Sequence, residues 1–150
     1  YDLNMPLKNS IIIKTDASTR NGDGVGIAFS ARVTKQEGVM FKEEGSRFVD
    51  SDCKTTYAET LAALYSLSEL NKSFKTKEIN FNNFIVIIES DCEHTVRKIN
   101  KENYSDKVDR SINHFRRRTR DLRSRWIPRS QNKKADAMAR EAFRRGEEEN

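Results

Sequence analysis

The first third of the chain shows the apolar pattern of short strands separated by tight turns. A β-branched isoleucine run at 11–13 ends in polar residues, as a buried strand does where it reaches the edge of a sheet. The Asn-Gly and Asp-Gly pairs at 21–24 supply the positive φ angles of a hairpin turn, so 25–33 is expected to return antiparallel. A second turn at Glu37-Gly38 leads into a third strand over 39–48. These segments predict a three-stranded antiparallel meander.

After the meander the spacing of apolar residues becomes helical and then alternates between strands and helices. Residues 55–70 have a helical apolar face without glycine or proline, and 84–88 is a continuous apolar run typical of a strand covered on both sides. The remaining expected elements are helices over 94–99, 108–122 and 132–145 and a short strand over 126–128. This order predicts an α/β fold, with one five-stranded mixed sheet and helices on both faces.

Four acidic residues stand in or beside these apolar elements: Asp16, Glu59, Asp91 and Asp136. A right-handed crossover places the first and fourth strands side by side, so Asp16 and Asp91 meet at carboxyl ends, where such sheets bind ligands. Small side chains beside Glu59 allow its helix to approach the sheet closely. Converging carboxylates repel one another and lose hydration, so such a cluster is costly without divalent cations.

Each of these acids also has an ordinary structural explanation. A glutamate such as Glu59, taken alone, is more often a solvated helix residue than a ligand. Asp136 has the position of a favourable charge at a helix N-terminus, and Asp91 that of a cap after a strand. The joint pattern of all four favours a metal site over coincidence.

Composition limits the chain to one domain and favours an anionic partner. Its 150 residues include 28 lysines and arginines against 23 acidic residues, and the resulting net charge of +5 fits nucleic acid. No apolar run reaches the length of a membrane span, and residues 1–10 lack the layout of a signal peptide. Cys53 and Cys92 have neither zinc-site nor disulfide-framework spacing. We therefore expect a soluble intracellular protein, cytoplasmic or nuclear, and Tyr1 as first residue suggests a piece of a longer polypeptide.

Four short blocks of the sequence resemble the signature of a known family. They are Lys14-Thr15-Asp16-Ala17-Ser18, Thr55-Thr56-Tyr57-Ala58-Glu59, Ser90-Asp91, and Asn132-Lys133-Lys134-Ala135-Asp136-Ala137-Met138-Ala139. In order, spacing and element type they look like the blocks of type 1 ribonuclease H, in the compact form without a basic handle. The resemblance covers 11–142 and implies the ribonuclease H-like fold, with strand order 3-2-1-4-5.

The same resemblance implies how the chain is divided into a domain and its flanking segments. An N-terminal extension is expected at 1–10, the ribonuclease H domain at 11–145, and an acidic C-terminal tail at 146–150. Gly146 is expected to end the last helix. The glutamates after it are expected to fray, because negative charge opposes the helix dipole at that end.

The resemblance implies a metal-dependent endonuclease that cuts the RNA strand of RNA/DNA hybrids and leaves 3′-hydroxyl and 5′-phosphate ends. Asp16 would bridge two Mg²⁺ ions, one of them shared with Glu59 and Asp91. Asp136 would share the other ion with Asp16, and Mn²⁺ is expected to substitute for Mg²⁺. Carboxylates are the ligands that Mg²⁺ prefers, and two cations about 4 Å apart activate water and stabilise the attacking and leaving oxygens.

The order of the acids separates this family from enzymes with a related sheet. Integrases and transposases have their glutamate last, whereas Glu59 is second here. Proofreading exonucleases begin with a DxE strand, whereas this chain has Asp16-Ala17-Ser18. Strand transfer and exonuclease activity are therefore disfavoured.

Substrate contacts are predicted on both sides of the carboxylates. Small polar side chains near the metals sense 2′-hydroxyls across the shallow minor groove of a hybrid. Such contacts are expected from Ser18, Thr19, Thr55 and Thr56, and further nucleic-acid contacts from Arg116, Arg117, Arg120, Arg129 and Asn132. The arginines between 116 and 123 would line the helix at 108–122 and hold DNA phosphates in a salt-dependent way. A solvated helix face is an equal alternative.

Departures from the family pattern leave other functions open. Thr55 and Thr56 replace an asparagine pair that many relatives carry, and 128–131 lacks a histidine thought to help product leave. Either Arg129 substitutes for it in part, or turnover is expected to be slow. The alternatives are a nucleic-acid or protein-binding module of a larger protein with weak or no cleavage, and a nuclease of other structured RNA. As an isolated domain the protein is expected to be a monomer.

Three further residues of types that often occur at functional sites are expected to be structural. His94 and His114 lack the spacing of metal ligands and are expected on the surface. Trp126 is expected in the core rather than as a stacking platform.

Overall fold

The part of the chain that the structure describes, residues 9–20 and 23–149 of the computed structural model, forms five strands and four helices. The strands are β1 (Ser10–Thr19), β2 (Val25–Lys35), β3 (Gly38–Val49), β4 (Ile85–Ser90) and β5 (Asp121–Trp126). The helices are α1 (Thr55–Thr76), α2 (Glu93–Asn100), α3 (Lys107–Arg116) and α4 (Lys133–Glu149), with short 3-10 turns η1 (Phe81–Asn83) and η2 (Arg129–Gln131). Most of the predicted extension at 1–10 and the Asn-Gly pair of the first turn lie outside the described residues.

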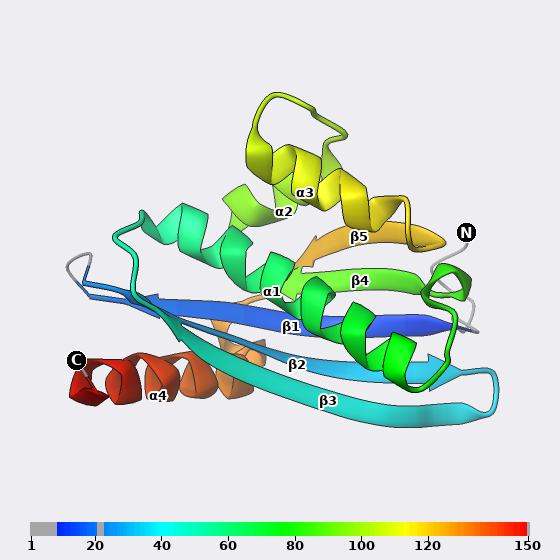
Figure 1. The fold of residues 1–150 in the computed structure, drawn as a ribbon, viewed down its shortest axis with the longest axis horizontal. Coiled ribbons are helices and arrows are strands. Elements are labelled where there is room, and N and C mark those ends of the chain that lie inside the picture. Colours follow the sequence, from blue (N-terminus) through cyan, green and yellow to red (C-terminus); the bar gives the residue numbers. More distant parts are fainter. Residues whose placement is uncertain (1–8, 21–22, 150) are drawn as a thin grey trace.

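The strands form one sheet in the order β3-β2-β1-β4-β5, which confirms the predicted mixed sheet. β1, β2 and β3 pair antiparallel, while β4 runs parallel to both β1 and β5. Three helices, α1, α2 and α3, lie on one face of the sheet and α4 lies on the other (Figure 1). The crossover from β3 through α1 therefore brings β4 beside β1, as the sequence predicts.

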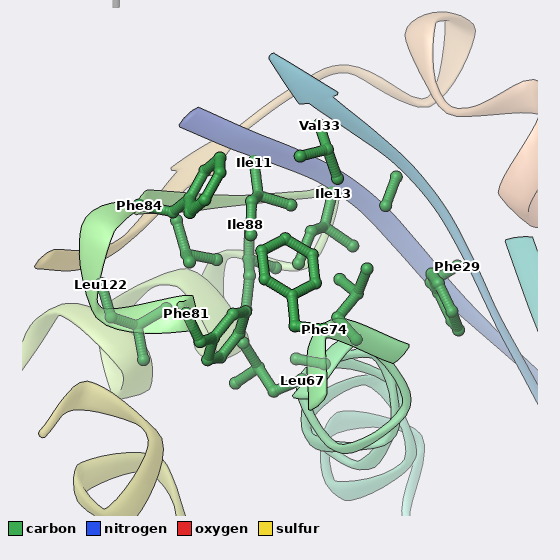
Figure 2. Packing of buried hydrophobic residues seen from close by; sticks show 14 of the residues in the cluster. Ile11, Ile13, Phe29, Val33, Leu67, Phe74, Phe81, Phe84, Ile88 and Leu122 are labelled. Atoms are coloured by element: carbon green, nitrogen blue, oxygen red, sulfur yellow. The ribbon is translucent and has the colours of Figure 1, made fainter. Parts of the chain in front are cut away.

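The main core lies between the sheet and α1 (Figure 2). Ile11 and Ile13 of β1 pack in one buried cluster with Phe74 of α1. The Phe74 ring makes edge-on contacts with Phe81 and Phe84, with ring centroids 5.1 and 5.2 Å apart. Because α1 is fixed along its length by this cluster, the position of its first turns against the sheet is fixed as well.

On the opposite face, α4 approaches β2 at Gly26. A Cβ atom at this position would lie 2.6 Å from the backbone nitrogen of Phe143 and would also meet the carbonyl oxygen of Ala139. Backbone atoms of a helix cannot move away as a side chain can. Glycine at position 26 therefore sets how closely α4, and every side chain that it carries, approaches the sheet.

Gly26→Ala is expected to lower the free energy of unfolding by about 3 kcal/mol, at the upper end of ordinary overpacking, because the added methyl group meets helix backbone. Urea unfolding followed by circular dichroism measures this change. Ser30→Ala is the matched control, because Ser30 lies in the same strand and on the same face of the sheet as Gly26. It should change stability by less than about 0.5 kcal/mol. Equal stability of Gly26→Ala and the parent would show that α4 does not pack as described.

Two expected boundaries are wrong. The helix expected over 108–122 ends at Arg116, and Asp121–Trp126 forms β5 instead, so the expected strand at 126–128 begins five residues earlier. The chain turns after Arg116, and the backbone N–H of Arg120 donates to the carbonyl oxygen of Phe84, next to the start of β4. The free edge of β4 pairs with this segment, and that pairing overrides the helical spacing of its apolar residues.

α4 does not end at Gly146 but continues to Glu149. Gly146 is buried, and a side chain there would collide with the ring of Phe48. Its role is close packing rather than helix termination. Arg144 donates to Glu148 at 2.7 Å and to Glu141 at 2.6 Å, and these pairs offset the unfavourable charge at the helix end.

Candidate active site

The site begins where β1 and β4 separate. The parallel pairing of these strands ends with Lys14 opposite Glu89, whereas β1 continues to Thr19 against β2. Asp16 therefore lies inside β1, just beyond its last contact with β4, and not at the strand end. Asp91 follows β4 directly. The separation of the two strands leaves room between the aspartates for a side chain from α1.

Glu59 of α1 fills that position. Oxygen atoms of Asp16, Glu59 and Asp91 all lie within 4.8 Å of one another. Asp16 is 5% exposed and Glu59 is 6% exposed, so the alternative of a solvated helix glutamate is wrong for Glu59. The Oε2 atom of Glu59 is buried and has no hydrogen-bond partner among the described residues. A buried, unpartnered carboxylate oxygen beside two further carboxylates matches the donor set of a hard divalent cation.

Burial and mutual repulsion strongly perturb two of these groups. Desolvation, followed by the charge of Asp91, raises the pKa of Asp16 to about 7. Desolvation, followed by the charge of Asp16, raises the pKa of Glu59 to about 10. The closeness of the two carboxyl groups favours the protonated form of Glu59 and the ionised form of Asp16. The raised pKa values keep at least one of the two groups protonated near neutral pH in the absence of a cation, and a bound cation would favour the ionised form of both.

Asp136 lies in the first turn of α4, outside this three-carboxylate cluster. Its carboxylate accepts from Arg140, one turn further along α4, at 3.2 Å from both Nε and Nη2. The charge of Asp136 contributes to raising the pKa of Asp16, after the larger effects of burial and Asp91, so the two groups are in electrostatic reach. The structure thus brings three of the four predicted acids together and leaves the fourth beside them in an ion pair.

Asn132 fixes α4 relative to β1. Its side-chain amide donates to the carbonyl oxygen of Thr15 at 2.9 Å, one residue before Asp16, and the side chain is fully buried. The predicted nucleic-acid contact of Asn132 is therefore corrected, because a buried amide that holds two elements together cannot reach a ligand. Its effect is to place the first turn of α4, and Asp136 with it, beside the cluster.

Trp126 holds the segment that carries Asp91. Its indole N–H donates to the carbonyl oxygen of Asp91 at 3.2 Å, and the side chain is 50% exposed, so the expectation of a core tryptophan is wrong. The backbone N–H of Cys92 also donates to the hydroxyl of Ser90 at 3.1 Å. The sequence does contain a signal for this role. Leu122, Ser124 and Trp126 alternate with arginines at a strand's period of two, which places Trp126 at the end of a strand beside Ser90.

The predicted substrate residues fall into two groups. Ser18 and Thr19 are half-buried near the end of β1, while Thr55 and Thr56 are exposed at the start of α1. Exposed positions also hold Arg117, Arg120 and Arg129. These seven side chains are available to a ligand.

Arg116 differs from the other arginines. Its guanidinium donates to the carbonyl oxygen of Leu122 at 2.6 Å and to that of Ile99, and so it joins α2, α3 and β5. This arginine holds three elements of the fold together rather than presenting a free charge.

Comparison with known proteins agrees with this arrangement. The family model described as reverse transcriptase-like matches residues 14–142, most of the chain and all four acids. The chain belongs to the reverse transcriptase-like family. Its members have the ribonuclease H-like fold, so the predicted family and fold are confirmed. A search of the curated proteins finds no match.

Solved structures share the fold of this reverse transcriptase-like chain at low sequence identity. The N-terminal ribonuclease H domain of Rv2228c from Mycobacterium tuberculosis superposes with a TM-score of 0.73 at 16% identity, covering 95% of this chain and 99% of the other. LC11 ribonuclease H1, isolated from compost and solved in complex with an RNA/DNA hybrid, gives 0.70 at 23%, covering 91% and 99%. Ribonuclease H1 of the archaeon Halobacterium salinarum gives 0.65 at 18%, covering 89% and 97%.

Other residue types in this reverse transcriptase-like domain do not join the site. His94 and His114 are exposed, as expected, and neither belongs to the three-carboxylate cluster. The two cysteines, Cys53 and Cys92, are free. None of the helices in the described part of the chain combines the length and apolar content that crossing a membrane requires.

Proposed function

We propose that the protein is a divalent-metal-dependent endonuclease that hydrolyses the RNA strand of RNA/DNA hybrids. The observation that carries this proposal is the buried cluster of Asp16, Glu59 and Asp91, within 4.8 Å of one another and with one oxygen unpartnered. The fold of the family supports it, and so does the hybrid bound by the LC11 enzyme, which has the same fold.

In this proposal Asp16, Glu59 and Asp91 would hold one Mg²⁺ ion, and Asp136 would hold a second ion together with Asp16. Bound Mg²⁺ would activate water and stabilise the charge on the reacting phosphate. Asp16 and Glu59 would have to be ionised to act as ligands, and because the pKa values of both are raised, metal binding would release protons and would be favoured by higher pH. Arg140 must release Asp136 for the second ion, and it is then free to contact a phosphate.

The remaining residues act on the substrate. Ser18, Thr19, Thr55 and Thr56 contact 2′-hydroxyls in the minor groove. Arg117, Arg120 and Arg129 contact phosphates and make binding sensitive to salt. The ends left by cleavage are a 3′-hydroxyl and a 5′-phosphate, and Mn²⁺ replaces Mg²⁺.

A binding module with little cleavage is the second candidate. The ion pair between Asp136 and Arg140 favours it, because this pair competes with the second metal ion. Three convergent carboxylates that repel one another are, however, costly in a protein that only binds. For this reason we rank cleavage first.

The two candidates are distinguished by incubating the protein with end-labelled RNA/DNA hybrid, duplex RNA and duplex DNA, in Mg²⁺, in Mn²⁺ or in EDTA. We expect the hybrid's RNA strand to be cut with either metal and to stay intact in EDTA, with duplex DNA uncut throughout. A hybrid that is bound but not cut with either metal would establish the binding module. Cleavage of duplex RNA as fast as cleavage of the hybrid would show that the enzyme acts on structured RNA in general and is not specific for hybrids.

A further inference from the structure

The face of the sheet that carries α4 is only partly covered by it. α4 packs over Gly26, and Figure 1 shows it beneath one end of the sheet only. Further along the strands, Arg32 and Lys42 are exposed. A hollow of about 410 Å³ lies there, with Ile12 and Lys14 of β1 and Arg32 of β2 in its floor. Lys134 in the first turn of α4 and Gln131 of η2 form one wall. This hollow is separate from the carboxylate cluster, and none of the predicted substrate residues lines it.

The charges in the hollow are unbalanced. Four cations line it, Lys14, Arg32, Lys42 and Lys134, against one acid, Glu89. That acid is already engaged by Arg125 of β5, whose Nε and Nη2 both donate to the same oxygen, at 3.0 and 2.6 Å. Lys134 is paired with Glu44, and Lys14 donates to the carbonyl oxygen of Gln131, which is neutral, so the excess positive charge of the hollow comes from Lys14, Arg32 and Lys42.

Two of these cations lie directly opposite each other. Arg32 of β2 and Lys42 of β3 are cross-strand partners, and both are exposed. Like charges in this relation destabilise a sheet. In the next row of the sheet, where Glu44 of β3 lies opposite Ser30, the charge is balanced, because Glu44 forms an ion pair with Lys134. Among the described residues, neither Arg32 nor Lys42 has a side-chain hydrogen bond or an ion pair.

The spacing of the cations suits several phosphates rather than one small anion. Ile12, Arg32 and Lys42 form one row across three strands, and Lys14 lies one row further along, opposite Ser30. Strands lie roughly 4.8 Å apart and residues on one face repeat about every 7 Å, so the positive charges extend over about 10 Å. An arginine holds a phosphate through two parallel hydrogen bonds, and lysines add point charges beside it. The partly exposed side chain of Ile12 offers an apolar surface between them.

We propose that this hollow, which we call the open-face site, binds the phosphodiester backbone of a single nucleic-acid strand, independently of sequence and of the metal site. Arg32 and Lys42 contact one or two adjacent phosphates, and Lys14 contacts the next. An acidic peptide would meet the same charges, since a carboxylate and a backbone phosphodiester each carry one negative charge, and the experiment below distinguishes the two occupants. The proposal does not rest on cleavage, because the site contains no residue of the carboxylate cluster.

The test uses the whole protein in EDTA, with labelled oligo(dT) of twelve nucleotides as the probe and binding measured over a range of NaCl concentrations. Arg32→Gln with Lys42→Gln is compared with Lys75→Gln with Arg110→Gln, an equal loss of exposed charge on α1 and α3, across the sheet. Removing two phosphate contacts should reduce the slope of log K against log salt by about 1.4 and weaken binding about fivefold or more at low salt. The control pair should leave the slope unchanged. Thermal unfolding should show the control pair as stable as the parent and the Arg32→Gln, Lys42→Gln variant at least as stable, because it removes two like charges that face each other.

Amide NMR locates the site independently. Oligo(dT) should shift the signals of Lys14, Ser30, Arg32 and Lys42 in the parent protein, and not in the Arg32→Gln, Lys42→Gln variant. Equal slopes for the two double variants, or shifts confined to other surfaces, would overturn the proposal. Shifts of these signals by pyrophosphate or polyglutamate but not by oligo(dT) would overturn it as well, since the occupant would then not be a nucleic-acid strand. Failure of hybrid cleavage in Mg²⁺ would leave this result untouched, so the two proposals fail separately.

Discussion

Asp16→Asn is expected to reduce Mg²⁺-dependent cleavage of an RNA/DNA hybrid by at least about 10³-fold. Asp16 has a carboxylate oxygen within 4.8 Å of those of both Glu59 and Asp91, and it is in electrostatic reach of Asp136. Asparagine keeps the size of the side chain but removes the charge that both proposed ions share. Loss of metal-assisted charge stabilisation costs several kcal/mol of barrier, which corresponds to three or more powers of ten in rate. Single-turnover cleavage of an end-labelled hybrid measures the change.

Asp50→Asn is the control for this substitution, since Asp50 is an exposed aspartate just after β3 and outside the carboxylate cluster. It should retain the parent rate within about twofold. Asp16→Asn should bind the hybrid in EDTA about as tightly as the parent, which separates loss of chemistry from loss of binding. Cleavage by Asp16→Asn at a rate close to that of the parent would refute the proposed active site.

The metal-free protein is expected to become less stable as pH rises from 5 to 9. The pKa of Asp16 is raised to about 7 and that of Glu59 to about 10. At a pH above the ordinary pKa of a carboxyl group but below these raised values, the folded state keeps protons that the unfolded state has lost. Unfolding then releases protons, and raising the pH favours it. The stabilising contribution is complete below about pH 4 and is lost as pH approaches the raised pKa values. Since one pKa unit corresponds to about 1.4 kcal/mol, we expect between pH 5 and 9 a loss of roughly 3 kcal/mol from Asp16 and about 5 kcal/mol from Glu59, at most about 8 kcal/mol together.

Urea unfolding in EDTA at pH 5, 7 and 9 measures this loss. Glu59→Gln lacks the titrating carboxyl group, so its stability should depend much less on pH. Glu37→Gln, at an exposed turn, should follow the parent. Burial and neighbouring arginines lower the pKa of His114, which acts in the opposite direction near pH 6 and is common to all three proteins. Mg²⁺ should stabilise the parent most at high pH, where the carboxylates are ionised. A parent whose metal-free stability rises with pH would contradict the raised pKa values.

The sequence predicts the convergence of the acids because their placement depends on topology. Asp16 and Asp91 belong to strands whose order follows from the meander and a right-handed crossover. Glu59 follows from small neighbours such as Ala58 and Ala62, which are fully buried against the sheet. These properties are encoded by local pattern and chain connectivity, which a single sequence contains.

The errors arise where a tertiary contact decides against a local pattern. The apolar spacing between Ile112 and Leu122 is helical, but β4 needs a partner at its free edge, and the segment that becomes β5 supplies it. Asn132 belongs to a recognisable motif, yet only the fold reveals that its amide bonds to Thr15 instead of a ligand. Gly146 has the usual appearance of a helix end, but the ring of Phe48 requires a glycine there. Each of these partners is distant in the sequence.

β3 is an edge strand of twelve residues, so one row of its backbone N–H and C=O groups faces away from the sheet. An exposed edge of this length is a template on which another chain can add a strand. Along it stand Lys42, Glu43, Glu44 and Arg47, charges that a second copy would have to bring together and dehydrate. Lys42, one of the cations that we assign to a nucleic-acid strand, thus also makes pairing of two copies through this edge less favourable. Variants that neutralise this edge should therefore be handled at low concentration, because the same change that removes a ligand contact also removes a barrier to aggregation.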